Sequence, residues 1–142
     1  MDKVIRRLQC HRGRLKKFKA EKYRGVEKIC LNSLCFQNIE TIKSMVDTFG
    51  GQSVVASLDV KKTILGGYKL YDSSCSNLHQ ADYFETHLEQ LLEAGVGEIM
   101  LGAIDKEGTL SGPDLVLINK VSEKIGVPLI SFLPLDLDAN VC

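Results

Sequence analysis

Polar residues follow three apolar segments of this chain, at positions where a ligand or a reacting group could be held. Asp59 follows the segment 53–58, which contains the β-branched pair Val54-Val55, Asp105 follows the apolar run 98–104, and Asn32 and Ser33 follow a shorter run. In parallel α/β proteins the carboxyl ends of the strands share one edge of the sheet, and ligands bind there. The sequence therefore predicts that these polar groups gather at one edge of a sheet.

Asp59 and Asp105 carry the carboxylates that proton transfer would need. Two carboxylates at strand ends can act as general acid and general base when their surroundings separate their pKa values. The alternative is structural, because Asp59 can cap a turn and Asp105 can order its own loop. The residue types leave both interpretations open for Asp59 and favour the structural one for Asp105.

The loop after Asp105 is expected to bind an anion. It contains Glu107 and Gly108 and leads into a predicted helix, whose first turn offers free N–H groups and a partial positive charge. This arrangement predicts a phosphate-sized ligand. Asn32 and Ser33 can likewise donate to a phosphate oxygen, or they can simply begin a helix as capping residues.

The cysteines and histidines indicate neither a metal site nor a bound cofactor. The five cysteines include no C-x-x-C pair, and no histidine lies at zinc-ligand spacing from them. We therefore expect reduced thiols, with Cys35 inert. His79 and His87 are too far apart to share one helical face as ligands, and both are expected at the surface.

Charge is distributed unevenly, although the formal net charge is zero. Residues 1–28 hold 11 of the 18 Lys and Arg and three acids, which gives +8 there and −8 over the rest. A basic arm can contact nucleic acid or a membrane surface, but a solvated tail is the simpler interpretation. No run approaches the ~20 apolar residues of a membrane span, and no signal-peptide core is found, so we expect a cytoplasmic protein.

Strand and helix patterns alternate from residue 26 onward. The strand candidates are continuously apolar, as expected when both faces of a sheet are covered, and the helix candidates carry apolar residues at helical spacing. The alternation predicts one α/β domain with parallel strands, and residues 1–24 show no strand signal. The expected strands are 26–33, 53–58, 98–104 and 127–131, the helices are 37–49, 81–94 and 114–125, and a hairpin is expected over 61–71.

Three blocks of the sequence resemble the cyclase subunit of imidazole glycerol phosphate synthase. They are Val26 to Ser33, Phe49 to Lys61 and Ala94 to Asp114, in the family's order and spacing over about residues 25–131. The resemblance implies a (β/α)8 barrel with its active site on the carboxyl-terminal rim.

The resemblance also implies a reaction in histidine biosynthesis that needs no cofactor. Ammonia from a glutaminase partner is used to convert a phosphoribulosyl formimino aminoimidazole carboxamide ribonucleotide into imidazole glycerol phosphate and aminoimidazole carboxamide ribonucleotide. Paralogues that serve sugar amidation in surface-polysaccharide synthesis are the alternative, because the three blocks do not separate the two.

Five residues of this chain match functional positions of that family. By resemblance, Asp59 stands at the second catalytic aspartate, on the fifth strand of the barrel. Asn32 and Ser33 match residues near one substrate phosphate, and Glu107 and Gly108 match an Asp-Gly pair that helps to hold the other.

The chain also departs from the family pattern. The first catalytic aspartate, on strand one, has no counterpart, and Ser131-Phe132-Leu133 stands where the family has Ser-Gly-Gly. A full barrel needs roughly 250 residues. We therefore expect a partial (β/α)8 TIM-type barrel of four parallel βα units in chain order, covering about strands 4 to 7. Its domain is 26–131, flanked by a basic divergent arm, 1–25, and a divergent tail, 132–142.

Four strands cannot close a cylinder, and this has two expected consequences. The inner face, formed by Val55, Ser57, Met100 and Leu129 or their neighbours, should be exposed and should promote self-association. A truncated or frame-shifted copy of this kind is also expected to be inactive on its own, unless it complements another half barrel.

Overall fold

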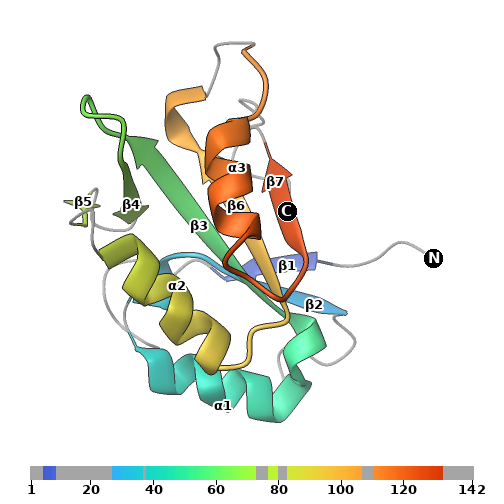
Figure 1. Ribbon diagram of the computed structural model, residues 1–142. Helices are drawn as coiled ribbons and strands as arrows, with labels where there is room; N and C mark the ends of the chain where they lie inside the picture. Colours follow the sequence, from blue (N-terminus) through green and yellow to red (C-terminus); the bar gives the residue numbers. More distant parts are fainter. Residues whose placement is uncertain are drawn as a thin grey trace.

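The computed structural model describes residues 5–8, 27–36, 38–72, 77–79, 83–106 and 111–132, which form one sheet with helices (Figure 1). Seven strands make up the sheet. They are β1 (Ile5–Leu8), β2 (Lys28–Leu31), β3 (Val54–Lys62), β4 (Tyr68–Asp72), β5 (Asn77–Leu78), β6 (Glu98–Ala103) and β7 (Leu129–Phe132).

The four predicted parallel strands are neighbours in chain order. β2 pairs with β3, β3 with β6 and β6 with β7, all in parallel, and helices connect them. This α/β arrangement of consecutive parallel strands confirms the predicted partial barrel. The predicted hairpin is also present, because β4 returns antiparallel to the end of β3 and β5 pairs with β4.

The expectation that residues 1–24 contain no strand was wrong. Residues Ile5–Leu8 form β1, which pairs in parallel with β2 along Lys28–Leu31. The segment Ile-Arg-Arg-Leu is too short and too charged to signal a strand by itself. Pairing with the edge of β2 decides its conformation, because strand preference depends more on tertiary context than on sequence.

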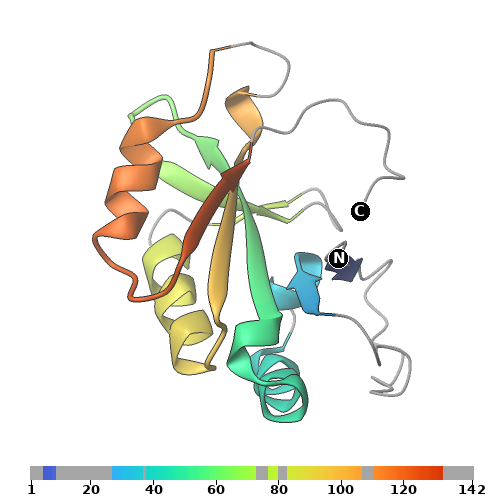
Figure 2. The same cartoon turned by 90° about the vertical axis from the view of Figure 1, so that its right-hand side faces the viewer.

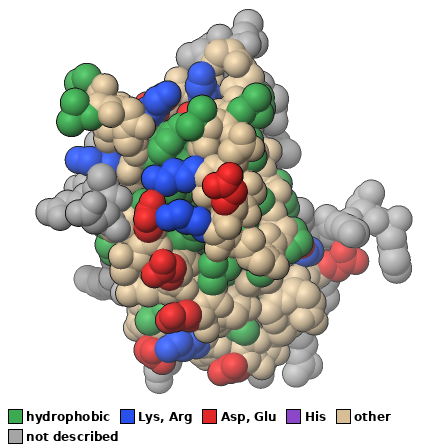
Figure 3. Space-filling view, in the orientation of Figure 1, with side chains coloured by type: hydrophobic (Ala, Val, Ile, Leu, Met, Phe, Trp, Pro, Cys, Tyr) green, Lys and Arg blue, Asp and Glu red, His purple; other side chains and the backbone are tan. Residues whose placement is uncertain are grey.

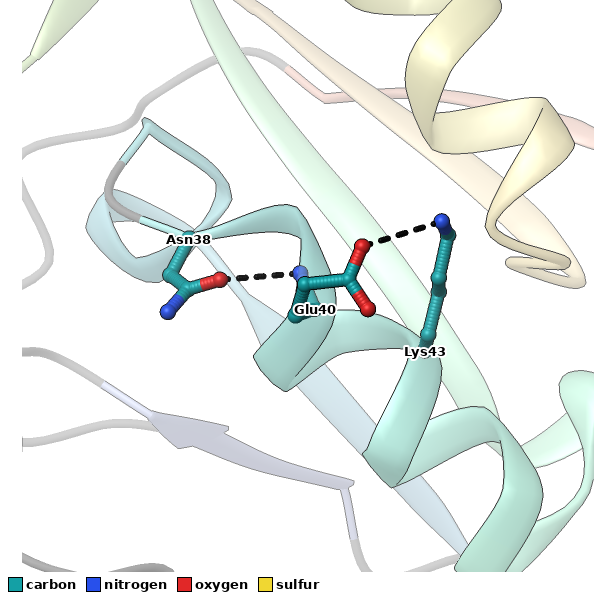
Figure 4. Close-up of polar contacts among 3 residues, drawn as sticks. All are labelled: Asn38, Glu40 and Lys43. Atoms are coloured by element: carbon teal, nitrogen blue, oxygen red, sulfur yellow. Dashed lines mark hydrogen bonds and ion pairs between the residues drawn. The ribbon is translucent and has the colours of Figure 1, made fainter.

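Three helices connect the parallel strands: α1 (Ile39–Phe49), α2 (Tyr83–Glu93) and α3 (Leu115–Ser122). Figure 2 shows α2 and α3 on one side of the strands, with α1 beside α2. The start of α1 is fixed by Asn38, whose side chain accepts a hydrogen bond from the N–H of Glu40 at 2.9 Å. Glu40 in turn forms an ion pair with Lys43 one turn later (Figure 4).

The core lies between the helices and the side of the sheet that they cover. Alternate residues of β3 point into it, as do the apolar faces of the three helices. Each of these side chains is almost fully buried. The core residues on the sheet include Ile29, Leu31, Ala56, Leu58, Val60, Ile99 and Leu101, and those on the helices include Ile42, Met45, Phe84, Leu88, Leu91, Leu117 and Val121.

Two glycines allow the loops before β3 and β6 to touch. A Cβ added to Gly97 would lie 2.3 Å from the carbonyl oxygen of Gly51, and one added to Gly51 would lie 2.5 Å from that of Gly95. Such distances are closer than any side chain tolerates. The contact brings the amino ends of β3 and β6 together and is supported by a hydrogen bond from the Gly97 N–H to the Val54 carbonyl, at 3.0 Å.

The expected exposure of the inner sheet face was wrong in its central part. Val55 is 2% exposed and Ser57 is 1% exposed, and Leu129 packs against the core on the other face. Neighbouring strands supply part of the cover, since the register sets Cys30 beside Val55 and Met100 beside Ser57. Toward the edge strand β7, exposure rises, and Ile130 is 38% exposed.

Candidate functional site

Asn32 and Asp59 meet at the carboxyl end of the parallel strands. Asn32 directly follows β2, and Asp59 lies near the end of β3 on the face opposite the helix-covered core. The Asn32 side-chain amide donates a hydrogen bond from Nδ2 to Oδ2 of Asp59, over 3.1 Å. Asn32 is 1% exposed and Asp59 is half-buried, so the amide holds the carboxylate while leaving it partly accessible.

Sequence reasoning placed Asn32 beside a phosphate and did not expect this contact. The backbone carbonyl of Asn32 also accepts a hydrogen bond from the N–H of Cys35, at 2.9 Å, in the short 3-10 helix η2 (Ser33–Phe36). Backbone and side chain of Asn32 thus both make hydrogen bonds, and the side chain is directed at the Asp59 carboxylate. The side chain of Ser33 lies outside the described residues.

Ser57 adds a polar group that sequence reasoning had not assigned to the site. It lies two residues before Asp59 on the same face of β3, and it follows Ala56, which pairs with Leu31, the residue before Asn32. Its hydroxyl oxygen is buried and has no hydrogen-bond partner among the described residues. A buried hydroxyl without a protein partner can form a hydrogen bond with a bound water or ligand. The two-residue spacing from Asp59 is the signal that could have identified it.

Asp105 has the structural role that its sequence favoured. It lies in the 3-10 helix η4 (Ile104–Lys106) after β6, and its carboxylate accepts a hydrogen bond from the backbone N–H of Lys62. The contact joins the end of β6 to the end of β3. A carboxylate used in this way orders the edge of the sheet.

Glu107 and Gly108, the residues of the predicted anion-binding loop, lie outside the described residues. The far end of that loop is described. Asp114 caps α3 by accepting a hydrogen bond from the Leu117 N–H at 3.1 Å, and it also accepts one from the Tyr68 hydroxyl at 3.0 Å. Burial and the hydrogen bond to Asp114 raise the pKa of Tyr68 to about 12. The contact attaches the β3–β4 hairpin to the start of α3.

An ion pair occupies the opposite end of the same sheet face. Lys28 at the start of β2 contacts Glu98 at the start of β6 across the intervening β3. Both side chains are largely buried, at 24% and 18% exposure. Polar groups thus lie at both ends of this face, with Val55 between them.

Four rings stack next to the site. Phe36 lies against His79 and His87, with centroid distances of 4.9 and 5.2 Å, and Tyr83 lies against the same two rings at 4.7 and 5.0 Å. The stack fixes η2, which begins next to Asn32, to the first turns of α2. The expected surface position of His87 was wrong, because it is 2% exposed, and His79 is half-buried.

Burial controls the titration of two groups near this stack. It lowers the pKa of His87 to about 4, with a further decrease from the charge of His79 and a smaller opposing increase from the nearby Gln90 side chain. Neither ring nitrogen of His87 makes a hydrogen bond of good geometry among the described residues. Burial also raises the pKa of the Cys35 thiol well above its usual range. Cys35 is a free cysteine, and its thiol donates to the Leu31 carbonyl at 3.2 Å, which fits the predicted inert thiol.

The described part of the chain holds no group of three or more His, Cys, Asp or Glu placed to bind a metal ion. No helix within the described ranges is long and apolar enough to cross a membrane.

Comparison with known proteins gives one consistent answer. The model of the family described as "Histidine biosynthesis protein" matches residues 14–131. A Pseudomonas aeruginosa protein, provisionally named imidazole glycerol phosphate synthase subunit hisF2, is 35% identical over 107 residues, which cover 75% of this chain and 42% of that protein. The imidazole glycerol phosphate synthase subunits HisF of Streptococcus sanguinis and Saccharolobus solfataricus are 32% and 31% identical, with the same coverage of both chains.

The chain thus spans about two fifths of the length of the curated relatives it matches. The match covers the four parallel strands β2, β3, β6 and β7 and the helices between them.

Proposed function

Because this chain belongs to the histidine biosynthesis protein family, we propose that it carries part of the active site of an imidazole glycerol phosphate synthase cyclase. The observation that carries the proposal is the hydrogen bond between Asn32 and Asp59 at the carboxyl end of the strands. Ligands of parallel α/β barrels bind at this end, and a carboxylate held by a buried amide there is suited to proton transfer.

In the proposed reaction, ammonia from a glutaminase partner reacts with a phosphoribulosyl formimino aminoimidazole carboxamide ribonucleotide. Release of aminoimidazole carboxamide ribonucleotide and closure of the imidazole ring both require protons to move. Asp59 acts as the general acid or base for these transfers, and Asn32 keeps its carboxylate in one orientation. The Ser57 hydroxyl lies on the same face and is a further hydrogen-bonding group for the substrate.

The two phosphates of the substrate are assigned to the strand ends on either side of Asp59. Ser33 and the neighbouring backbone lie on the β2 side, and Glu107 and Gly108 lie in the loop after β6. Glycine lets a phosphate approach the backbone closely. Glu107 places a second carboxylate near that phosphate, so we expect the loop to bind it weakly.

The described strands form an incomplete barrel. We therefore propose full activity only for an assembly in which the remaining strands are supplied. A second protein segment, either another copy of this chain or a complementary half barrel, would pack along β7, where Ile130 is exposed. A chain that does not assemble in this way would be an inactive remnant of the cyclase.

The test uses the purified 142-residue chain with the ribonucleotide substrate and an ammonium salt, and it measures the release of aminoimidazole carboxamide ribonucleotide. The assay is run with the chain alone and with the glutaminase subunit and glutamine. Asp59→Asn is the test variant, and Asp47→Asn, on the exposed side of α1, is the matched control.

Ammonia-dependent turnover that is lost in Asp59→Asn and kept in Asp47→Asn supports the proposal. If turnover is absent, the same proteins are titrated with imidazole glycerol phosphate by calorimetry. Binding of this product supports a substrate site in an incomplete barrel. If neither turnover nor binding is observed, the chain is assigned to the inactive alternative.

A further inference from the structure

The tip of the β3–β4 hairpin exposes two large aliphatic side chains completely. Ile64 is 105% exposed and Leu65 is 98% exposed, the highest values among the exposed large hydrophobic residues of the described chain. Figure 3 shows hydrophobic side chains projecting from the body of the protein where Figure 1 places this hairpin. Turns usually carry Gly, Asn, Asp or Ser at their tips, so turn formation does not account for this pair.

The tip is held in a defined conformation. The Thr63 N–H donates to the Gly67 carbonyl at 2.7 Å, and the Gly67 N–H donates to the Thr63 hydroxyl at 3.0 Å. Gly66 adopts a φ of +83° with no atom within 4 Å of an added Cβ, so glycine is needed there for its backbone conformation. Ile64 and Leu65 are therefore presented by a closed turn.

Three lysines surround the base of the tip. Lys61 and Lys69 lie directly opposite each other in the antiparallel register, and Lys62 is their neighbour. Like charges placed opposite each other destabilise a strand pair. None of the ion pairs found among the described residues involves these three lysines. Asp105 is the nearby acid, and its carboxylate accepts a hydrogen bond from the backbone N–H of Lys62.

The lysines and the aliphatic pair line one open hollow. Its volume is about 400 Å³, and it is bounded by Lys61, Lys62, Thr63, Ile64, Leu65 and Lys69. Ammonium groups without an ion-pair partner favour the binding of an anion, and two exposed aliphatic side chains favour contact with an apolar phase. The surface of an anionic lipid bilayer supplies both.

We propose that the β3–β4 hairpin is a membrane-docking element, with Ile64 and Leu65 inserted among the lipids and the lysines bound to anionic headgroups. The dimensions agree, since Ile64 lies three residues beyond Lys61, which is at most about 10 Å at ~3.3 Å per extended residue. An amphipathic element buries its apolar part about 5–10 Å into the interface, and lysine side chains extend back to the headgroups. The proposal is independent of the proposed catalytic function.

The test is co-sedimentation of the full chain with vesicles. One set contains phosphatidylcholine with about one third phosphatidylserine, and the other contains phosphatidylcholine alone. The tip variant is Ile64→Ser with Leu65→Ser. The matched control is Leu115→Ser with Val116→Ser on α3, because these two side chains are each 65% exposed and the lysines one and two turns further along, Lys120 and Lys124, are ion-paired with Glu85. Both pairs are at the surface, and circular dichroism checks that each variant folds.

The wild-type protein is expected to bind the phosphatidylserine vesicles and to dissociate as salt is raised. The tip variant should bind at least about tenfold more weakly, and the α3 control should bind like the wild type. Changing Lys61 and Lys69 to Gln should weaken binding about 25-fold, at about fivefold for each lysine, and should remove the preference for phosphatidylserine.

Several results would overturn the proposal. Absence of vesicle binding would do so, as would equal losses in the tip and α3 variants. Binding that survives the tip variant would assign it to another part of the chain, such as the basic segment 1–28. Release by millimolar inorganic phosphate would indicate a site for small anions, and self-association through the tip in the absence of vesicles would indicate a second copy as the partner.

Discussion

His87 makes the stability of this fold depend on pH between neutral and acidic conditions. Burial, reinforced by the charge of His79, lowers the pKa of the folded His87 from an ordinary 6.5 to about 4. The folded protein therefore binds this proton less tightly than the unfolded chain does. The resulting stabilisation is fully present above pH 6.5 and is lost as the pH falls toward 4.

The size of the effect follows from the shift in pKa. A decrease from 6.5 to about 4 corresponds to about 3 kcal/mol of unfolding free energy, at about 1.4 kcal/mol for each pH unit. The group is 2% exposed, so solvent reduces this value little. Replacing His87 with Phe keeps a flat ring between Phe36 and Tyr83 and removes the proton-binding site.

His87→Phe should also maintain or raise the unfolding free energy at neutral pH. Neither nitrogen of His87 makes a hydrogen bond of good geometry among the described residues. A buried polar atom in that state costs about 1–3 kcal/mol. We therefore expect His87→Phe to be at least as stable as the wild type at pH 7 and more stable than it by an additional ~3 kcal/mol at pH 4.

The assay is urea unfolding, followed by circular dichroism at several pH values between 7 and 4. The unfolding free energies of the two proteins are subtracted at each pH, so that the contribution from the carboxylates present in both cancels. One of these is Glu85, whose pKa is lowered by hydrogen bonds to Lys124 and Lys120. Tyr83→Phe is the control, since it changes the same stack without removing the histidine, and its curve should run parallel to that of the wild type. If the His87→Phe curve were also parallel to the wild type over this range, the reasoning would be refuted.

Three further predictions concern packing, the hairpin and the anion-binding loop. Gly97→Ala should lower the unfolding free energy by about 2 kcal/mol in urea titrations, because the added Cβ would collide with the backbone of the Gly51 loop. The control is Gly126→Ala, which should change the unfolding free energy by less than about 0.5 kcal/mol, because nothing lies within 4 Å of the added Cβ. Tyr68→Phe removes hydrogen bonds to a carboxylate and should cost about 2 kcal/mol by the same measurement, together with the loss of the tyrosine that titrates near pH 12 in ultraviolet spectra. Chemical-shift titration should detect phosphate binding on the order of millimolar that Gly108→Val abolishes and Asp59→Asn leaves intact; the reverse pattern would exchange the two assigned roles.

The parallel framework could be predicted because its signals are local. The spacing of apolar residues placed α1 within two residues of its observed start, and the helix ends at the predicted residue, followed by Gly50 with a φ of +83°. The strand predicted to end at Leu58 continues to Lys62 as β3. Asp59 and Val60 were not assigned to it, and Lys61 and Lys62 were expected in the hairpin, so pairing with the returning strand β4 determines where the strand ends.

The helical spacing of apolar residues in α2 indicates that position 87 is buried, although His87 itself was expected at the surface. Phe84, His87, Leu88 and Leu91 are the buried residues of α2, at the spacing of one helical face. His87 was expected at the surface once a metal-binding role with His79 had been set aside. The His87 ring stacks on Tyr83, one turn earlier on the same helix, and on Phe36, a residue far away in the sequence whose contact no local pattern reveals.

The candidate site was predicted in location but not in its internal contacts. The rule that parallel strand ends share an edge was sufficient to bring Asn32 and Asp59 together. Which of them faces a ligand depends on the register of β2 against β3, which pairs Leu31 with Ala56 and so brings Asn32 within reach of Asp59. With the Asn32 amide bound to the carboxylate and its carbonyl bound to Cys35, removing that side chain should alter the orientation of Asp59 more than the binding of phosphate. Asn32→Ala is therefore expected to lower kcat in any assembly that turns over and to leave the affinity for inorganic phosphate unchanged, as measured by steady-state kinetics and titration. A loss of phosphate affinity with kcat preserved would restore Asn32 to the phosphate-binding role that its sequence position first indicated.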